Sequence, residues 1–437
     1  MRRKFVGFVV VVLAAAWLAS GPGPVWGQGQ TWAGKSLARL LETAHWRMDR
    51  LRINASFSLA DAGYDSDIFY GYLDEPFPDY TFSATLPIQA LFPVSKTVVL
   101  EIDEAPQYLY YHRNARERAW NNILAGRLHV SLDRLYLQAG GGLSDVRRRM
   151  TPELDINVRE RAGAAQGIVL WQANRNVSFA AVGDYTRYDY GELSLGQANV
   201  AQNLNRVEGF ADLVTYIQPG AHVRFFLDGQ YGRYAFSEIV NRQRNTDSYA
   251  VFSGISFLAP EGDAPPAQPF QGNICVGYKF FDILNPAYPN GSGLVGLIDV
   301  SANVFKRTMA RAYVARDYAF SVFSDAAFYL STALSGGLSY QLTTALTLNY
   351  DVAYTKGTYP PSLPLGSPSG YDFRYFSHTI NLSVRFARYL EVSLQAMLGR
   401  RTVENLSQAR TRNLFGLNVL YGIPAGRVDV PTRGLTR

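Results

Sequence analysis

Polar and apolar residues alternate along many segments of this chain of 437 residues, and no other feature limits the fold as strongly. Successive side chains of a β-strand point to opposite faces, so a period of two predicts strands that meet water on one face and an apolar medium on the other. The period is clearest over residues 51–59, 124–132, 379–386 and 390–396. Each run is about as long as a tilted strand that crosses a bilayer.

The breaks between these runs alternate in length. Bacterial outer-membrane barrels have short periplasmic turns and long external loops, and an even strand number that leaves both chain ends on the periplasmic side. The short links are 133–134, 174–176, 218–220, 306–308, 343–344 and 387–389. The long links are 60–78, 112–120, 144–158, 188–204, 237–247, 281–293, 320–328, 357–373 and 400–412. This rhythm predicts an all-β protein, a transmembrane antiparallel β-barrel of about eighteen strands over residues 49–422.

Two alternatives remain open at this point. Sixteen strands is one, because the link at 259–269 is long for a periplasmic turn and the segments near 160–170 and 309–319 alternate poorly. A soluble β-sandwich is the other, since it also alternates apolar with polar residues. The aromatic content of 14% favours the barrel, because Tyr and Phe gather beside the long links, where rings settle at the headgroup level of a membrane. Stacking of these rings on sugars is the other interpretation.

The first thirty residues have the composition of an export signal. Three basic residues at positions 2–4 precede an apolar run over 5–19, and Val25 and Gly27 provide a small-residue cleavage site. We therefore expect residues 1–27 to be a cleavable signal peptide, with a retained membrane anchor as the alternative. The chain contains one cysteine, Cys275, so an internal disulfide is excluded.

A short helix is expected in the N-terminal segment, residues 28–48. Leu37, Leu40, Leu41 and Ala44 recur at helical spacing between Ser36 and Arg47. The helix would lie in the periplasm or in the lumen and cap the barrel mouth, or it would dock a partner.

Charged residues at the alternate, non-apolar positions predict a polar lumen. An outward Arg or Lys costs about 2–4 kcal/mol at the bilayer midplane, so these side chains are expected to point inward. An eighteen-strand barrel is wide enough for a water-filled channel, although a ladder of charges that only stiffens the wall is an alternative. The predicted pore-lining residues are Arg206, Glu208, Asp212, Arg224, Asp228, Asp299, Asp351, Arg385 and Glu391.

Arginines also gather in two predicted external loops. Clustered guanidinium groups pair well with phosphate or carboxylate, which predicts contact with lipopolysaccharide or an acidic polysaccharide. Simple solvation of the loops is the alternative. These residues are Arg113, Arg116 and Arg118 in one loop, and Arg147, Arg148 and Arg149 in the next.

The sequence gives little indication of an enzyme, a metal site or a cofactor, although Asp65-Ser66-Asp67 could hold a calcium ion and a barrel enzyme is a third alternative. The five histidines are scattered without ligand spacing, and no nucleophile elbow or phosphate-binding glycine loop is present. Loss of the basic residues at 2–4 with the signal would lower the net charge from +6 to +3, which gives no indication of nucleic acid as a partner.

The opening strand and its loop contain Gly63-Tyr64-Asp65-Ser66-Asp67, which resembles the first-strand motif of outer-membrane β-barrel proteins of the BBP2 porin-like family, with Asp67 in place of the usual Asn. The hairpin at 336–359 is similar to the penultimate region of that family. The resemblance implies an outer-membrane channel of a Gram-negative-type bacterium, of a kind associated with exopolysaccharide or capsule export and so with periplasmic export components. A structural or adhesive barrel whose loops bind surface glycans is the second function considered.

The C-terminus departs from the usual outer-membrane pattern. Such barrels usually end on an aromatic residue that the barrel assembly machinery reads, whereas here the last strand closes near Tyr421 and a tail over 423–437 follows. An internal assembly signal that ends at Tyr421 is therefore expected.

Overall fold

The computed structural model describes residues 31–69, 76–149, 153, 157–192, 194–195, 198–199, 201–258, 270–323, 326–360, 372–403, 408–424 and 426–428. The predicted signal peptide and most of the tail lie outside the described residues.

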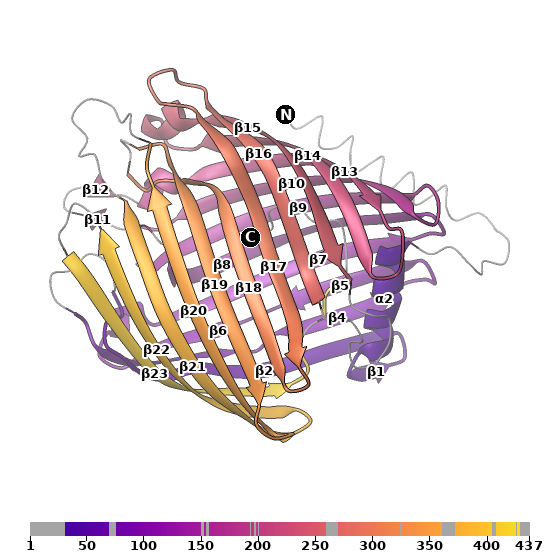
Figure 1. Cartoon of the computed structure of the whole chain (residues 1–437), viewed down its shortest axis with the longest axis horizontal. Helices are drawn as coiled ribbons and strands as arrows, with labels where there is room; N and C mark the ends of the chain where they lie inside the picture. The colour runs from indigo at the N-terminus through magenta and orange to yellow at the C-terminus, as the bar shows by residue number, and fades with distance from the viewer. Residues whose placement is uncertain are drawn as a thin grey trace.

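The chain forms a closed antiparallel barrel of eighteen strands with one N-terminal helix, as predicted (Figure 1). Closure comes from the pairing of the first wall strand with the last, in which Tyr64 lies opposite Phe415. A soluble β-sandwich is thereby excluded, because its two sheets keep open edges. The wall strands are β2 (Leu51–Asp65), β3 (Asp79–Thr85), β4 (Ile88–Pro93), β5 (Val98–Glu104), β6 (Gln107–Tyr111), β7 (Ala119–Ser131), β8 (Leu135–Arg149), β9 (Asn157–Gln172), β10 (Val177–Tyr190), β13 (Arg206–Ile217), β14 (Val223–Phe236), β15 (Thr246–Phe257), β16 (Phe270–Ile283), β17 (Gly291–Phe305), β18 (Thr308–Phe320), β19 (Phe328–Gln341), β20 (Leu346–Thr358), β21 (Phe373–Ala387), β22 (Leu390–Val403) and β23 (Gln408–Gly422).

Two prolines interrupt the second and third wall strands. Pro87 separates β3 from β4 and Pro106 separates β5 from β6, because proline has no N–H for the ladder. Their carbonyls still take part: Pro87 accepts from Ser56 N at 3.1 Å, and Pro106 accepts from Leu86 N at 3.0 Å. Each interrupted pair therefore counts as one wall strand, which gives eighteen.

The two ends of the barrel differ. One end, here the helix end, carries the short links, the helix α2 (Trp32–Thr43) and the strand β1 (Trp46–Met48). The other, the loop end, carries the long links and their short elements, which are η1 (Ala115–Glu117), β11 (Ser194–Leu195), β12 (Ala198–Asn199), η2 (Ala201–Leu204) and η3 (Val240–Arg244). Figure 1 shows α2 at the right and β11 and β12 at the left.

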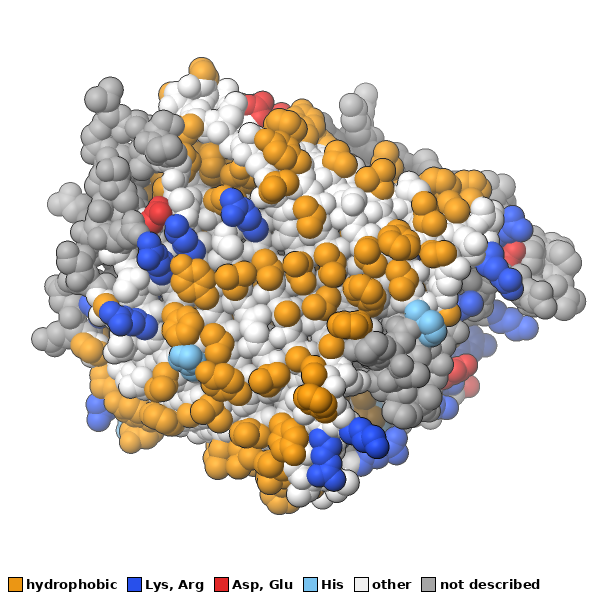
Figure 2. Space-filling view, in the orientation of Figure 1, with side chains coloured by type: hydrophobic (Ala, Val, Ile, Leu, Met, Phe, Trp, Pro, Cys, Tyr) orange, Lys and Arg blue, Asp and Glu red, His pale blue; other side chains and the backbone are white. Residues whose placement is uncertain are grey.

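Large apolar side chains cover the outward face. In β13 the exposed fraction is 2% for Asp212, 72% for Leu213 and 3% for Val214, so the alternation separates an interior from an exterior face. The exterior residues form hydrophobic stripes along the barrel wall (Figure 2). A soluble protein rarely exposes so large an apolar surface, whereas a barrel in lipid requires it.

The hairpin of β18 and β19 bends into the barrel mouth. Pairing of β17 with β18 ends at Gly296 and Arg316, while pairing of β18 with β19 continues to Phe320 and Phe328. The Phe320 ring lies 4.9 Å from the ring of Tyr234 on β14, which is not a neighbouring strand. The link at 320–328, predicted to be an external loop, therefore packs inside the loop end, because its aromatic residues bury against β14 and β16.

Helix α2 begins and ends four residues earlier than predicted. Thr31 caps it by accepting from Gly34 N at 3.2 Å, so Ser36 is inside the helix rather than at its start. After Thr43 the chain turns to pair β1 with β2, and His45 N donates to Asn54 Oδ1. No helix within the described ranges is long and apolar enough to cross a membrane.

Candidate functional site

Helix α2 lies inside the helix end of the barrel. Ala33, Leu37 and Leu40, spaced at i, i+4 and i+7, are at most 6% exposed. They pack against the inward face of β4, β5, β8, β9, β10 and β13, through Leu91, Val99, Tyr136, Leu170, Ala180 and Val214. The helix therefore covers one side of the mouth.

Close approach of α2 to the wall depends on a glycine. A Cβ atom at Gly34 would lie 2.2 Å from Ser131 Oγ, so a larger residue there would force helix and wall apart. Trp32 anchors the start of the helix, with its ring centroid 5.8 Å from that of Tyr216 and 3.9 Å from the Arg224 guanidinium.

The chain returns to the barrel interior after β23. Gly426 N donates to Gln89 Oε1 at 3.1 Å, and Gln89 Nε2 donates to Gly426 O at 2.9 Å. Val428 packs on the same apolar cluster as α2. The helix end is therefore narrowed both by α2 and by residues 426–428.

Gln89 connects this segment to a buried polar network in the wall. Gln89 Nε2 donates to Glu101 Oε1 at 2.7 Å, and the second carboxylate oxygen of Glu101 lies 2.7 Å from His129 Nε2. His129 Nδ1 is 2.7 Å from the Tyr136 hydroxyl. His129 and Tyr136 are each 0% exposed, so this trio braces the wall beneath α2 and no substrate reaches it.

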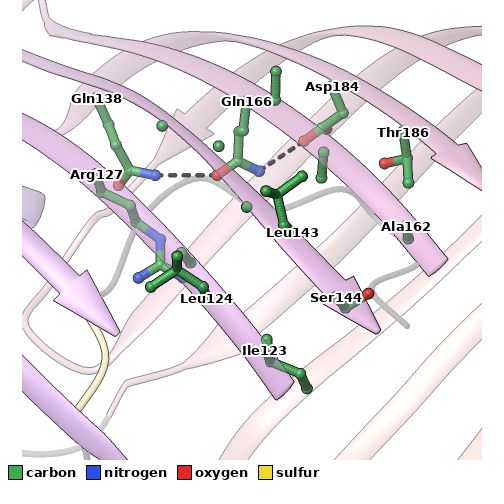
Figure 3. Close-up of a pocket in the computed structure, with 16 residues that line it drawn as sticks. Ile123, Leu124, Arg127, Gln138, Leu143, Ser144, Ala162, Gln166, Asp184 and Thr186 are labelled. Carbon is green, nitrogen blue, oxygen red and sulfur yellow. Dashed lines mark hydrogen bonds between the residues drawn. The ribbon is translucent and has the colours of Figure 1, made fainter. Parts of the chain in front are cut away.

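Small side chains leave an open pocket of about 300 Å³ on the wall formed by β7 to β10. The inward-facing residues of its floor are glycines and alanines, which are Ala125, Gly140, Gly142, Ala162 and Ala164. A polar ladder crosses it: Gln138 Nε2 donates to Gln166 Oε1 at 3.0 Å, and Gln166 Nε2 donates to Asp184 Oδ1 at 2.7 Å (Figure 3). The run at 139–142 (Ala-Gly-Gly-Gly) is the sequence signal for this floor.

Many charged side chains on the inward face form acid–base pairs. The side chains of Asp299, Arg311, Arg385 and Glu391 are between 36% and 65% exposed, so water reaches this side of the interior. The inward pairs are Arg127–Glu101 at 3.3 Å, Arg206–Glu208 at 2.7 Å, Lys279–Asp317 at 2.9 Å, Arg311–Asp299 at 3.1 Å, Arg385–Glu391 at 3.4 Å and Arg412–Asp65 at 2.5 Å.

At the loop end, Glu153 is buried against the inward-bent hairpin. Its carboxylate accepts from Ser321 Oγ at 2.6 Å, from Val322 N at 2.7 Å and from the Tyr359 hydroxyl, and its backbone carbonyl accepts from Arg401. Burial raises the pKa of this carboxyl to about 7, against the opposing effects of its hydrogen bonds and of the nearby arginines Arg244 and Arg401. Sequence reasoning missed this residue, because it lies in a predicted external loop.

Arg244 holds the hairpin from its other side. Its guanidinium is 0% exposed and donates to the carbonyls of Asn203, Ser321 and Ala327. Three links of the loop end are joined by this one side chain.

The nine predicted pore-lining residues lie on the inward-facing positions of their strands, but they differ in exposure. Arg206, Asp212, Arg224 and Asp228 are at most 6% exposed, so packed residues cover them. Arg224, for example, lies under Trp32 of α2. Five side chains remain accessible or partly accessible, which are those of Glu208, Asp299, Asp351, Arg385 and Glu391.

The predicted arginine clusters are dispersed. Residues 147–149 belong to β8 rather than to a loop, so neighbouring side chains point to opposite faces. Arg147 pairs with Glu117 at 2.7 Å and Arg148 with Glu160 at 2.6 Å, while Arg149 Nη2 donates to Ile68 O at 3.4 Å.

In the link before β7, Arg118 donates to the carbonyls of Tyr111 and His112 and stacks on Tyr110. Arg113 N donates to Asp79 Oδ1, and Arg116 O accepts from Arg147. Part of the charge expected for anion contact is therefore used inside the protein.

No group of His, Cys, Asp or Glu within the described ranges is arranged to hold a metal ion.

No family model matches the sequence, and comparison with curated proteins gives no match either. Among solved structures, the chain is similar to a BenF-like porin from Pseudomonas fluorescens Pf-5 (TM-score 0.49, 11% identity, 86% of this chain and 99% of that one). It is also similar to the outer membrane protein OpdK from Pseudomonas aeruginosa (TM-score 0.48, 12% identity, 85% and 98%). A bacterial polysaccharide outer membrane secretin gives a TM-score of 0.37 at 6% identity over 85% of this chain and 99% of that one. Likeness at this level concerns the barrel architecture and assigns no function.

Proposed function

We propose that this protein is an outer-membrane channel for small hydrophilic solutes that carry little net charge. The observation that carries the proposal is the inward face, where the accessible pairs Arg311–Asp299 and Arg385–Glu391 lie within 3.4 Å and a wall of glycine and alanine on β7 to β10 leaves open space. Paired charges give an aqueous path without a strong field of either sign, so neither anions nor cations would be strongly favoured.

The outward apolar surface supports the location, because a closed barrel covered with large apolar side chains is stable only in lipid. The long links would then face the outside of the cell, and residues 1–27 would direct export. Assembly by the barrel assembly machinery would follow from the same location.

Small solutes fit the interior better than a polymer does. The helix end is narrowed by α2 and by residues 426–428, and the loop end by the β18–β19 hairpin. Polysaccharide export rests on the family resemblance alone. The adhesive alternative has no support in the described loops, whose arginines largely serve internal contacts.

Single-channel conductance in planar bilayers tests the proposal. Ala164 faces the pocket, and Ala165 is its outward neighbour on the same strand, opposite the exposed Tyr185. Ala164→Trp should lower conductance because the indole enters the aqueous path. Ala165→Trp adds the same side chain on the lipid face and should leave conductance unchanged.

A reversal potential near zero in a salt gradient is also expected for the unaltered protein. A folded barrel, verified by its heat-dependent mobility in gels, that conducts no ions would refute the channel function. Equal conductance of the two Trp variants would refute the proposed path.

A further inference from the structure

The pocket on β7 to β10 is built from two adjacent rows of inward residues. Direct pairing across the four strands forms the first row, here the ladder row, which consists of Arg127, Gly140, Gln166 and Asp184. The second row, here the floor row, lies two residues nearer the loop end and consists of Ala125, Gly142, Ala164 and Thr186. Since no side chain of the floor row is longer than threonine, the wall is hollow beside a polar edge (Figure 3).

This hollow lies on the loop side of the constriction formed by α2. Leu170 on β9 packs in the cluster that holds α2, and Gln166 lies four residues away along the same strand, or about 13 Å. Ala164, further toward the loop end, is exposed to the interior. A solute that enters from the loop end therefore meets the pocket before it meets the helix.

The polar edge of the pocket is held in a fixed orientation. Gln138 donates to Gln166, and Gln166 donates to Asp184, so the direction of each amide group is set by its neighbour. A primary amide has two N–H donors, and the ladder uses one of them in each glutamine. The second N–H of each amide, together with the hydroxyls of Ser144 and Thr186, gives this edge both donors and acceptors.

The charges around the pocket disfavour an anionic solute. Its lining contains one cation, Arg127, and one anion, Asp184. Arg127 is already bound by two carboxylates: its Nη1 lies 3.3 Å from Glu101 Oε1 and donates to Asp103. An anion would thus meet three carboxylates and a guanidinium that is already paired, and juxtaposed like charges cost affinity.

We infer that this pocket is a binding subsite for neutral, hydroxyl-rich solutes of the size of one or two sugar rings. The inference deepens the proposed channel function and rests on it. Hydroxyl groups donate to the Asp184 carboxylate and accept from the glutamine amides, while the C–H face of a ring lies on the floor row and beside Ile123, which is inward and 50% exposed. A volume of about 300 Å³ is at the small end of ligand pockets, which limits the length of the solute.

Saturation-transfer NMR of the detergent-purified full-length protein, titrated with glucose, tests this site. Gln166→Ala should weaken glucose binding about tenfold, because it removes a binding amide and releases Gln138 and Asp184 from their fixed orientation. The control is Gln395→Ala on β22, an inward glutamine of the opposite wall that accepts from Asn418 Nδ2 at 3.0 Å. The control should bind glucose as the unaltered protein does, and equal weakening in both variants would overturn the inference.

A second variant fills the pocket without changing its polar groups. Ala164→Leu should abolish glucose binding, whereas Ala165→Leu, on the lipid face of the same strand, should not. Alanine 164 is preferable to Gly142 for this purpose, because a Cβ atom at Gly142 would lie 2.9 Å from the backbone oxygen of Leu124. Heat-dependent mobility in gels verifies that each variant is folded.

Sugars of the same shape and different charge test the class of solute. Glucuronate, an anion, and protonated glucosamine, a cation, should each bind more weakly than glucose, and tighter binding of either one would overturn the inference. NMR detects binding without a current, so the two proposals fail separately. A folded barrel that conducts ions and binds no glucose would refute the subsite alone, whereas one that binds glucose and conducts no ions would refute the channel.

Discussion

Truncation of Leu37 should release α2 from the barrel wall. Leu37 is 3% exposed within the cluster that joins the helix to six wall strands, and replacing a buried leucine by alanine costs about 2–5 kcal/mol. A cost of about 3 kcal/mol raises the population of the undocked helix roughly 150-fold, since each 1.4 kcal/mol is a factor of ten.

Trypsin reports this population, because Lys35 and Arg39 lie on the exposed face of α2 and a folded helix resists cleavage. When opening and closing are fast compared with cleavage, the cleavage rate follows the open population. Leu37→Ala should therefore be cut at these two sites faster by up to that factor, and its conductance should rise as the mouth widens. Glu42→Ala, at an exposed position of the same helix, is the control. If the two variants are cut equally fast, the docking of α2 does not depend on this contact, and the proposed narrowing of the helix end by α2 is refuted.

Three other outcomes are expected. Val251 is outward and 59% exposed near the middle of β15, so Val251→Arg should lower the free energy of unfolding in lipid vesicles by about 2–4 kcal/mol. Ala164→Arg places the same side chain inside the barrel and should be tolerated. Equal losses of stability in the two variants would contradict the assignment of faces. The pKa of Glu153 is raised to about 7 from its ordinary 4.5, so between these pH values the native state binds a proton that the unfolded chain does not. The contact of Glu153 with Ser321 and Val322 should therefore be most stable below pH 4.5 and weaken as the pH rises through 7. Hydrogen exchange of the Val322 amide should show this pH dependence, and Glu153→Gln should remove it. Arg311→Gln leaves Asp299 without its partner and should shift the reversal potential toward cation selectivity, whereas Asp299→Asn should shift it toward anion selectivity. The double variant should restore a reversal potential near zero. An unchanged reversal potential in all three variants would place the conducting path elsewhere.

The barrel could be predicted from the sequence because its two faces meet different solvents. Leu213 between Asp212 and Val214 illustrates this: lipid requires the apolar side chain, and the next position is free to be polar. Strand number and link lengths follow from the same pattern, which is why the predicted eighteen strands agree with the structure. The bounds of α2 were less predictable, since Thr31 and Ser36 are both good helix caps and only the contact with the wall decides between them.

Coverage of the interior could not be predicted, because it depends on contacts between segments far apart in sequence. Asp212 and Asp299 have the same alternating pattern, yet Asp212 is 2% exposed whereas the side chain of Asp299 is 40% exposed. The inward bend of the β18–β19 hairpin had one indication in the sequence, which is the pair of aromatic residues Phe320 and Phe328 at the two ends of a link that was predicted to be an external loop. The arginines at 147–149 were misplaced because an extended strand continues past the level at which the loop was expected to start.

Contact between α2 and the segment after β23 sets an order of assembly. Leu40 of α2 and Gly426, which follows β23, lie against each other, and the Gln89 amide donates a hydrogen bond to the Gly426 carbonyl. Gly426 can reach this position only once the β2–β23 pairing has placed the segment after β23 at the helix end. The contact of Leu40 with this segment is thus made only after the cylinder closes, so a barrel halted with an open seam would keep the packing of α2 on β4 to β13 but lack the cover that residues 426–428 add at the helix end.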